Sequence, residues 1–190
     1  NMSHTAPSNA ITKLTKDNIP RDQWIQLTVT YDGSSKAKGF RLFMNGKEMV
    51  METVVDQLTK DILLQEQKQP GLQIGGWSRG LGFKGGKADD ITVYNRELTP
   101  YEIQILAAKT SWASIGHKKK NDLVAAYLAI LKDYYLSAVY PPAIKERQEL
   151  KQLRTALADS MENIPELMVM QEMPKPKITH LLKRGNYDAP

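Results

Sequence analysis

Paired carboxylates are the first side chains to consider for chemistry, because hydrolytic enzymes use one as an acid and a second as a base or nucleophile. The sequence has an acidic pair, Asp89 and Asp90, at the start of an alternating run. In an extended strand, adjacent side chains point to opposite faces, so these two carboxylates do not act on one atom. Asp89 is better suited to accept backbone hydrogen bonds at a turn and to hold the entry into the strand.

A glycine-rich stretch carries the second group of candidates. Trp77, Arg79 and Phe83 lie among Gly75, Gly76, Gly80, Gly82, Gly85 and Gly86. An exposed aromatic ring beside an arginine makes a platform for a sugar or a protein, and the competing interpretation is that Trp77 packs over a sheet edge. No Gly-Lys-Ser/Thr follows, so the stretch does not predict a phosphate loop.

Metal and nucleophile chemistry is not indicated by the remaining residue types. Cysteine is absent, and His4, His117 and His180 lie far apart in the sequence. The net charge is +5, but the basic residues are dispersed and the run at 118–120 precedes a helix. Dispersed charge predicts a solvated surface and no nucleic-acid partner. No apolar run approaches the roughly 20 residues of a membrane span, so none is predicted.

Strands must position these candidates. A short strand is expected around 9–12, and longer ones at 24–31 and 40–44, where aromatic and β-branched residues alternate. Asn45-Gly46 predicts a tight hairpin turn, because both residues tolerate positive φ, and 47–55 is then the partner strand. Further strands are expected at 71–76 and 88–94.

Helices follow the last strand. Thr99, Pro100 and Glu102 have the spacing of a capping box, which predicts a helix start at Pro100. Two more helices, starting near Asn121 and at Pro141-Pro142, predict an antiparallel helical hairpin with an apolar seam at Leu150, Leu153, Leu157 and Met161. Short strands are expected at 168–170 and 178–182.

Four motifs in order resemble the second half of a LamG-like domain of the concanavalin A-like jelly-roll fold. They are the segments 24–33, 42–46, 72–75 and 86–99, the last one with its glycine, acidic pair, alternating strand and short helix. The resemblance implies an incomplete jelly roll, since a full one needs about twice as many strands. It also implies that Asp89 lies near a calcium site, for which hard oxygen ligands are suited. The Glu-x-Asp-x-x-Glu triplet of glucanases with this fold does not occur.

The tail carries a second resemblance. Residues 164–174 and 180–190 are similar to the opening of a C-terminal domain of unknown function in planctomycete-type multidomain proteins. These are exported bacterial proteins that carry a cytochrome-c-like module upstream. No Cys-x-x-Cys-His occurs here, so haem is expected only in such an upstream module, and no cofactor other than calcium is expected within this chain.

These patterns predict a mainly β jelly roll followed by a helical hairpin and a short extended tail. The expected parts are a LamG-like segment at 1–110, a linker at 111–120, a helical connector at 121–164 and the start of the C-terminal domain at 165–190. The expected function is non-catalytic binding of a carbohydrate or protein, in an extracytoplasmic bacterial protein whose other domains are further partners. The alternative is part of an enzyme of polysaccharide degradation or redox chemistry whose active residues lie outside this chain.

Overall fold

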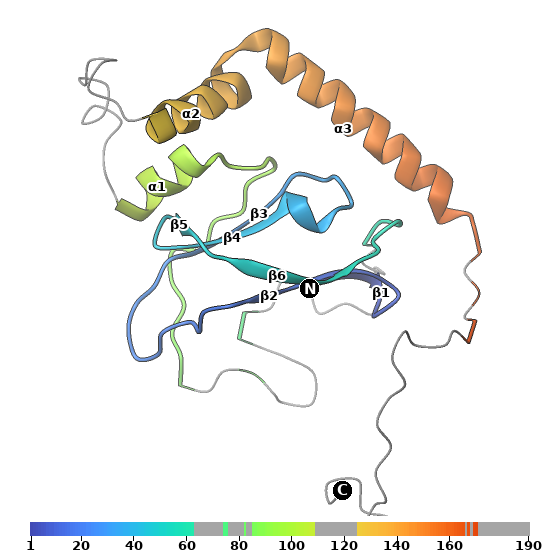
Figure 1. The fold of residues 1–190 in the computed structure, drawn as a ribbon, viewed down its shortest axis with the longest axis horizontal. Coiled ribbons are helices and arrows are strands. Elements are labelled where there is room, and N and C mark those ends of the chain that lie inside the picture. Colours follow the sequence, from blue (N-terminus) through green and yellow to red (C-terminus); the bar gives the residue numbers. More distant parts are fainter. Residues whose placement is uncertain are drawn as a thin grey trace, which may run out of the picture.

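A computed structural model describes the chain over residues 1–62, 74, 75, 82, 85–108, 125–165, 167, 169 and 170. Within these residues it consists of two small antiparallel sheets followed by helices (Figure 1). This confirms the predicted fold class of a partial jelly roll followed by helices. In the part of the chain that is described, no helix is both long and apolar enough to cross a membrane.

The first sheet has the order β1-β2-β6, formed by β1 (Met2–Thr5), β2 (Asn9–Thr15) and β6 (Met51–Asp56). The short strand expected around 9–12 is confirmed as part of β2, whereas β1 was not predicted from its polar sequence. Ile11, at 1% exposure, packs with Ala37 and Leu58 to form the core under this sheet. Asn9 fixes the chain beyond β6, because its side chain donates to Thr59 Oγ1 and accepts from the Thr59 amide, both at 2.8 Å.

The second sheet has the order β3-β4-β5, formed by β3 (Leu27–Tyr31), β4 (Phe40–Met44) and β5 (Lys47–Glu48). The Asn45-Gly46 turn is confirmed, with φ of 49° and 80°. The single strand predicted at 47–55 is wrong in one respect. After β5 the chain leaves the second sheet at Met49 and Val50 and enters the first as β6. The alternating pattern is the same on both sides of such a crossing, so it does not reveal the change of sheet.

The helices begin with α1 (Pro100–Ala108), which packs against the turn of the second sheet. A Cβ atom on Gly46 would lie 2.9 Å from the Ala107 Cβ atom, so the turn needs glycine for this close approach as well as for its φ. Phe43, Leu98 and Ile103 form the core between α1 and the sheet. Tyr101 continues outward to Tyr127, with a centroid distance of 6.3 Å, and so joins α1 to the next helix.

Two consecutive helices follow, α2 (Ala125–Tyr134) and α3 (Pro141–Glu162), with a π-helical turn η5 (Tyr135–Val139) between them. The predicted antiparallel packing is wrong, because α3 diverges from α2 at a wide angle (Figure 1). Its seam is exposed at 45% for Leu150, 69% for Leu153 and 64% for Leu157. The π turn ends at Tyr140, where an extended backbone redirects the chain before Pro141.

Val169 and Met170 are not part of a strand, so the strand expected at 168–170 is not formed at the residues described there. The strands expected at 71–76 and 178–182 lie almost wholly outside the described residues, and the linker at 111–120 lies entirely outside them.

Candidate binding groove

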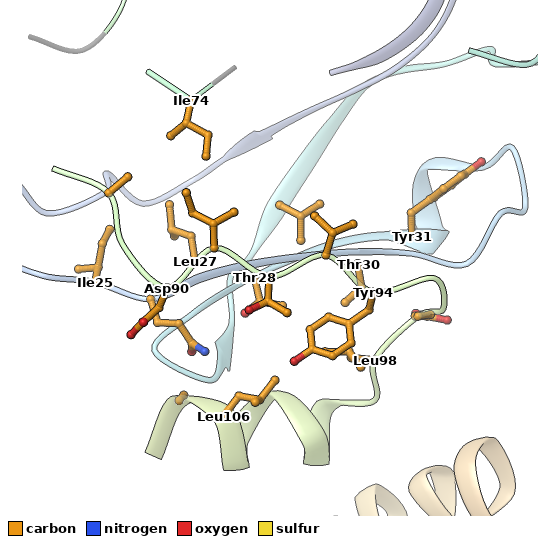
Figure 2. Close-up of a pocket in the computed structure, with 18 of the residues that line it drawn as sticks. Ile25, Leu27, Thr28, Thr30, Tyr31, Ile74, Asp90, Tyr94, Leu98 and Leu106 are labelled. Carbon is orange, nitrogen blue, oxygen red and sulfur yellow. The ribbon is translucent and has the colours of Figure 1, made fainter. Parts of the chain in front are cut away.

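A groove of about 3280 Å³ runs along β3. One wall is β3 with the segment that leads into it, and the other is the segment 85–98. Figure 2 shows side chains from both walls and from α1 around this space. Pockets for drug-sized molecules measure about 300 to 1,000 Å³, so the groove has the size of a site for a polymer.

One edge of β3 pairs with β4, and no strand of the described residues pairs with the other edge. The amide of Asn45 donates to Gln26 O at 2.9 Å and the amide of Asp32 donates to Gly39 O at 3.3 Å, on either side of the β3–β4 register. Hydrogen-bonded pairs alternate along an antiparallel ladder, so Thr28 and Thr30 also bond to β4. The intervening residues Leu27, Val29 and Tyr31 therefore direct their N–H and C=O groups away from β4, toward the groove.

The opposite wall was predicted as a strand at 88–94, and this prediction is wrong. The segment belongs to neither sheet, and Asp90 has a φ of 52°, which interrupts an extended conformation. The sequence pattern is that of a strand, but a strand forms only where a neighbour supplies backbone partners. Here the facing edge of β3 lies across the groove, and no strand formed by the described residues lies between the two walls.

Apolar side chains line both walls. Leu27 and Val29 alternate on β3 with exposures of 47% and 56%, and Ile91 and Val93 alternate on the opposite wall with 57% and 80%. Residues two apart in an extended chain share a face, so each wall presents one apolar face. Such a contiguous exposed surface marks a binding site more often than scattered single residues do.

The capping box of α1 anchors the second wall. Glu102 Oε2 accepts from the Thr99 amide at 2.9 Å and from Thr99 Oγ1 at 3.0 Å, as predicted, while the Glu102 amide reaches Thr99 Oγ1 at 3.4 Å. Arg96, which the sequence did not single out, adds a two-pronged ion pair to the same carboxylate. Burial acts to raise the pKa of Glu102, but the hydrogen bonds from Arg96 and Thr99 outweigh it and the pKa is lowered. The segment that ends at Arg96 is thus fixed to the first turn of α1.

A group of charges closes the groove at the end of β3. Glu97 is partly buried there, and burial raises its pKa, with the nearby Asp32 adding to the effect and Arg41 and Arg147 opposing it. Sequence reasoning missed this group, because its members come from four separate elements and share no spacing.

Helix α3 supplies the basic side of this end. Arg154 donates to Asp32 O at 2.7 Å, and Arg147 lies 3.7 Å from Asp133 Oδ1. At the far end of the helix, Lys60 donates to Glu162 O at 3.1 Å and to Ile164 O at 2.6 Å. The helix is therefore bonded to the β unit through Arg154 and at its C-terminal end, and to α2 through Arg147, which the sequence did not predict.

Of the predicted site residues, the structure describes Asp89 alone. Trp77, Arg79 and Phe83 lie outside the described residues, so their platform stays a prediction. Asp89 is exposed at the groove, and its Oδ1 accepts the Asp90 amide at 2.9 Å, as expected for an acid that holds a turn.

Calcium near Asp89 also stays a prediction. Calcium takes six to eight oxygen ligands, and Asp89 supplies two at most. Among the described residues no group of three or more acidic or histidine side chains is placed to hold a metal.

The comparison with protein families is consistent with this geometry. A family model described as the concanavalin A-like lectin/glucanases superfamily matches residues 1–104, more than half of the chain. The chain belongs to this superfamily. Comparisons with curated proteins and with solved structures gave no match.

Proposed function

We propose that the β unit with α1 is a non-catalytic binding module for a carbohydrate or protein ligand, and that α2 and α3 connect it to further domains. The observation that carries the proposal is the polymer-sized groove in a domain of the lectin/glucanases superfamily. The contacts of Lys60 and Arg154 support the connector role, since they hold α3 to the β unit. The resemblance of the tail supports an exported bacterial multidomain protein as the setting.

The alternative is part of an enzyme of polysaccharide degradation or redox chemistry with its active residues elsewhere. Glu97 is the observation that favours hydrolysis within the described residues, because a raised pKa suits a general acid. One contact argues against a catalytic pair with Asp32. The Asp32 carboxylate already accepts the Ser34 amide at 2.9 Å.

Replacing Trp77 tests where a glycan binds. We expect Trp77→Ala to weaken glycan binding about tenfold, because the ring would lose its stacking contact with the sugar. The second variant is Trp24→Ala, which removes an exposed indole that lines the groove and so tests whether the glycan lies there instead. Binding is measured by titration calorimetry with the glycans that a glycan array selects. A loss with Trp24→Ala and none with Trp77→Ala would move the glycan site from the glycine-rich segment into the groove.

A further inference from the structure

We propose that the groove takes an extended polypeptide strand, which runs antiparallel to β3 and joins it to the segment 88–94. The inference rests on the proposed binding role and names the ligand class of the groove. Peptide segments bind in this way when a sheet edge offers unpaired backbone groups, and side-chain pockets then select the sequence. An unpaired edge is otherwise a liability for aggregation.

Backbone geometry supplies the first argument. Leu27, Val29 and Tyr31 direct their N–H and C=O groups into the groove, as the β3–β4 register shows. Figure 2 shows that β3 and the segment from Asp90 to Tyr94 run in the same direction. A single guest strand can therefore be antiparallel to both walls at once, which is the more stable form of pairing.

The side chains supply the second argument. Leu27, Val29, Ile91 and Val93 are apolar and about half exposed or more, at alternate positions of the two walls. A guest strand with apolar side chains at alternate positions would continue this surface and cover it. A glycan has no aliphatic side chains with which to cover these groups.

Charge at the two ends gives the guest a direction. The groove is lined near the start of β3 by three acids and two bases, which are Asp22, Asp89, Asp90, Arg21 and Lys87. The end near α3 has four bases and two acids, which are Arg96, Arg147, Lys151, Arg154, Asp32 and Glu97. The antiparallel guest begins at the α3 end, so we infer acidic residues at its N-terminal end and basic residues at its C-terminal end.

A peptide and one proline variant test the proposal. The probe has about six alternating valine and threonine residues, two N-terminal glutamates and two C-terminal lysines. We expect it to bind and to slow hydrogen exchange of the amides of Leu27, Val29 and Tyr31. Val29→Pro removes a groove-facing amide without breaking a β4 bond, and it should weaken binding about tenfold. Val29→Thr keeps the amide and should bind within about twofold of the natural chain.

Each other outcome contradicts the proposal. If a peptide with its two charged ends exchanged binds equally well, the proposed direction of the guest strand is wrong. Unchanged exchange at the three amides, or equal binding by Val29→Pro, overturns strand pairing. Dimers in light scattering that Val29→Pro abolishes would make a second copy the occupant. If a glycan selected on the array slows exchange of the same amides, the ligand of the groove is a glycan and not a peptide. The broader binding role would still stand.

Discussion

Glu102→Ala is expected to lower the free energy of unfolding by about 3 kcal/mol. The carboxylate is nearly buried and serves the Thr99 cap and Arg96 together. Its loss removes the carboxylate half of the capping box and the Arg96 pair, and so frees the segment that forms the second wall of the groove. Urea unfolding monitored by circular dichroism measures the change.

Two comparison variants separate the cap from the ion pair. Glu102→Gln can still close the capping box but cannot pair as an ion with Arg96, so it should cost about 1 kcal/mol. Glu149→Ala removes an exposed acid that lies 3.9 Å from Lys145, and it should cost under about 0.5 kcal/mol. Equal losses for the alanine and glutamine variants at position 102 would show that the cap contributes nothing.

The effect of Glu102 depends on pH in a defined direction. The pKa of Glu102 in the folded chain is lower than its ordinary value of 4.5. The stability that the ionised group supplies is therefore present above pH 4.5 and is lost as the pH falls through the lowered pKa. The difference in the free energy of unfolding between the natural chain and Glu102→Gln should be constant near neutral pH and should become smaller in acid.

Lys60→Met is expected to release the C-terminal end of α3 at a cost of about 2 kcal/mol. Lys60 is 8% exposed, and its ammonium group donates to Glu162 O and Ile164 O. Methionine has a similar length but no donor, so both carbonyl groups at the helix end lose this partner. The negative C-terminal end of the helix dipole also stabilises a cation at this position.

Hydrogen exchange along α3 measures this release. We expect faster exchange near Ser160 and Glu162 in Lys60→Met, and unchanged exchange in β2 and β4. Lys151→Met is the matched control, because it removes an exposed lysine from the same helix. Equal exchange of the helix in all three chains would show that Lys60 does not hold α3, and the connector role would lose its main support.

Local signals made much of the fold predictable from the sequence. Asn45-Gly46 and the Thr99–Glu102 box depend on residues close in the chain, so their geometry follows from residue type. The change of sheet at Met49 depends on pairing with the distant Thr12. The position of α3 depends on the distant Lys60. No local sequence pattern encodes either contact. The segment 88–94 is another example. Its alternating sequence is that of a strand, but the pattern does not tell whether a neighbouring strand is present to pair with it.

The site was predictable to a smaller extent. Asp89 accepts a backbone amide, as predicted, but the strand that it was expected to open is not formed. The groove itself was not predicted, since it arises between β3 and a segment about 60 residues later in the sequence. Glu97 and Arg154 meet at its end only through the fold, so neither was distinguishable from other surface charges.

The central claim is binding without catalysis, and one incubation tests it. The purified chain is presented to a glycan array, and the sugars that it captures are then incubated with it in solution and analysed by mass spectrometry. We predict that captured sugars are recovered unchanged after prolonged incubation, with binding retained. Shortened or oxidised sugars that appear in proportion to the amount of chain would contradict the account and identify this chain as part of an enzyme.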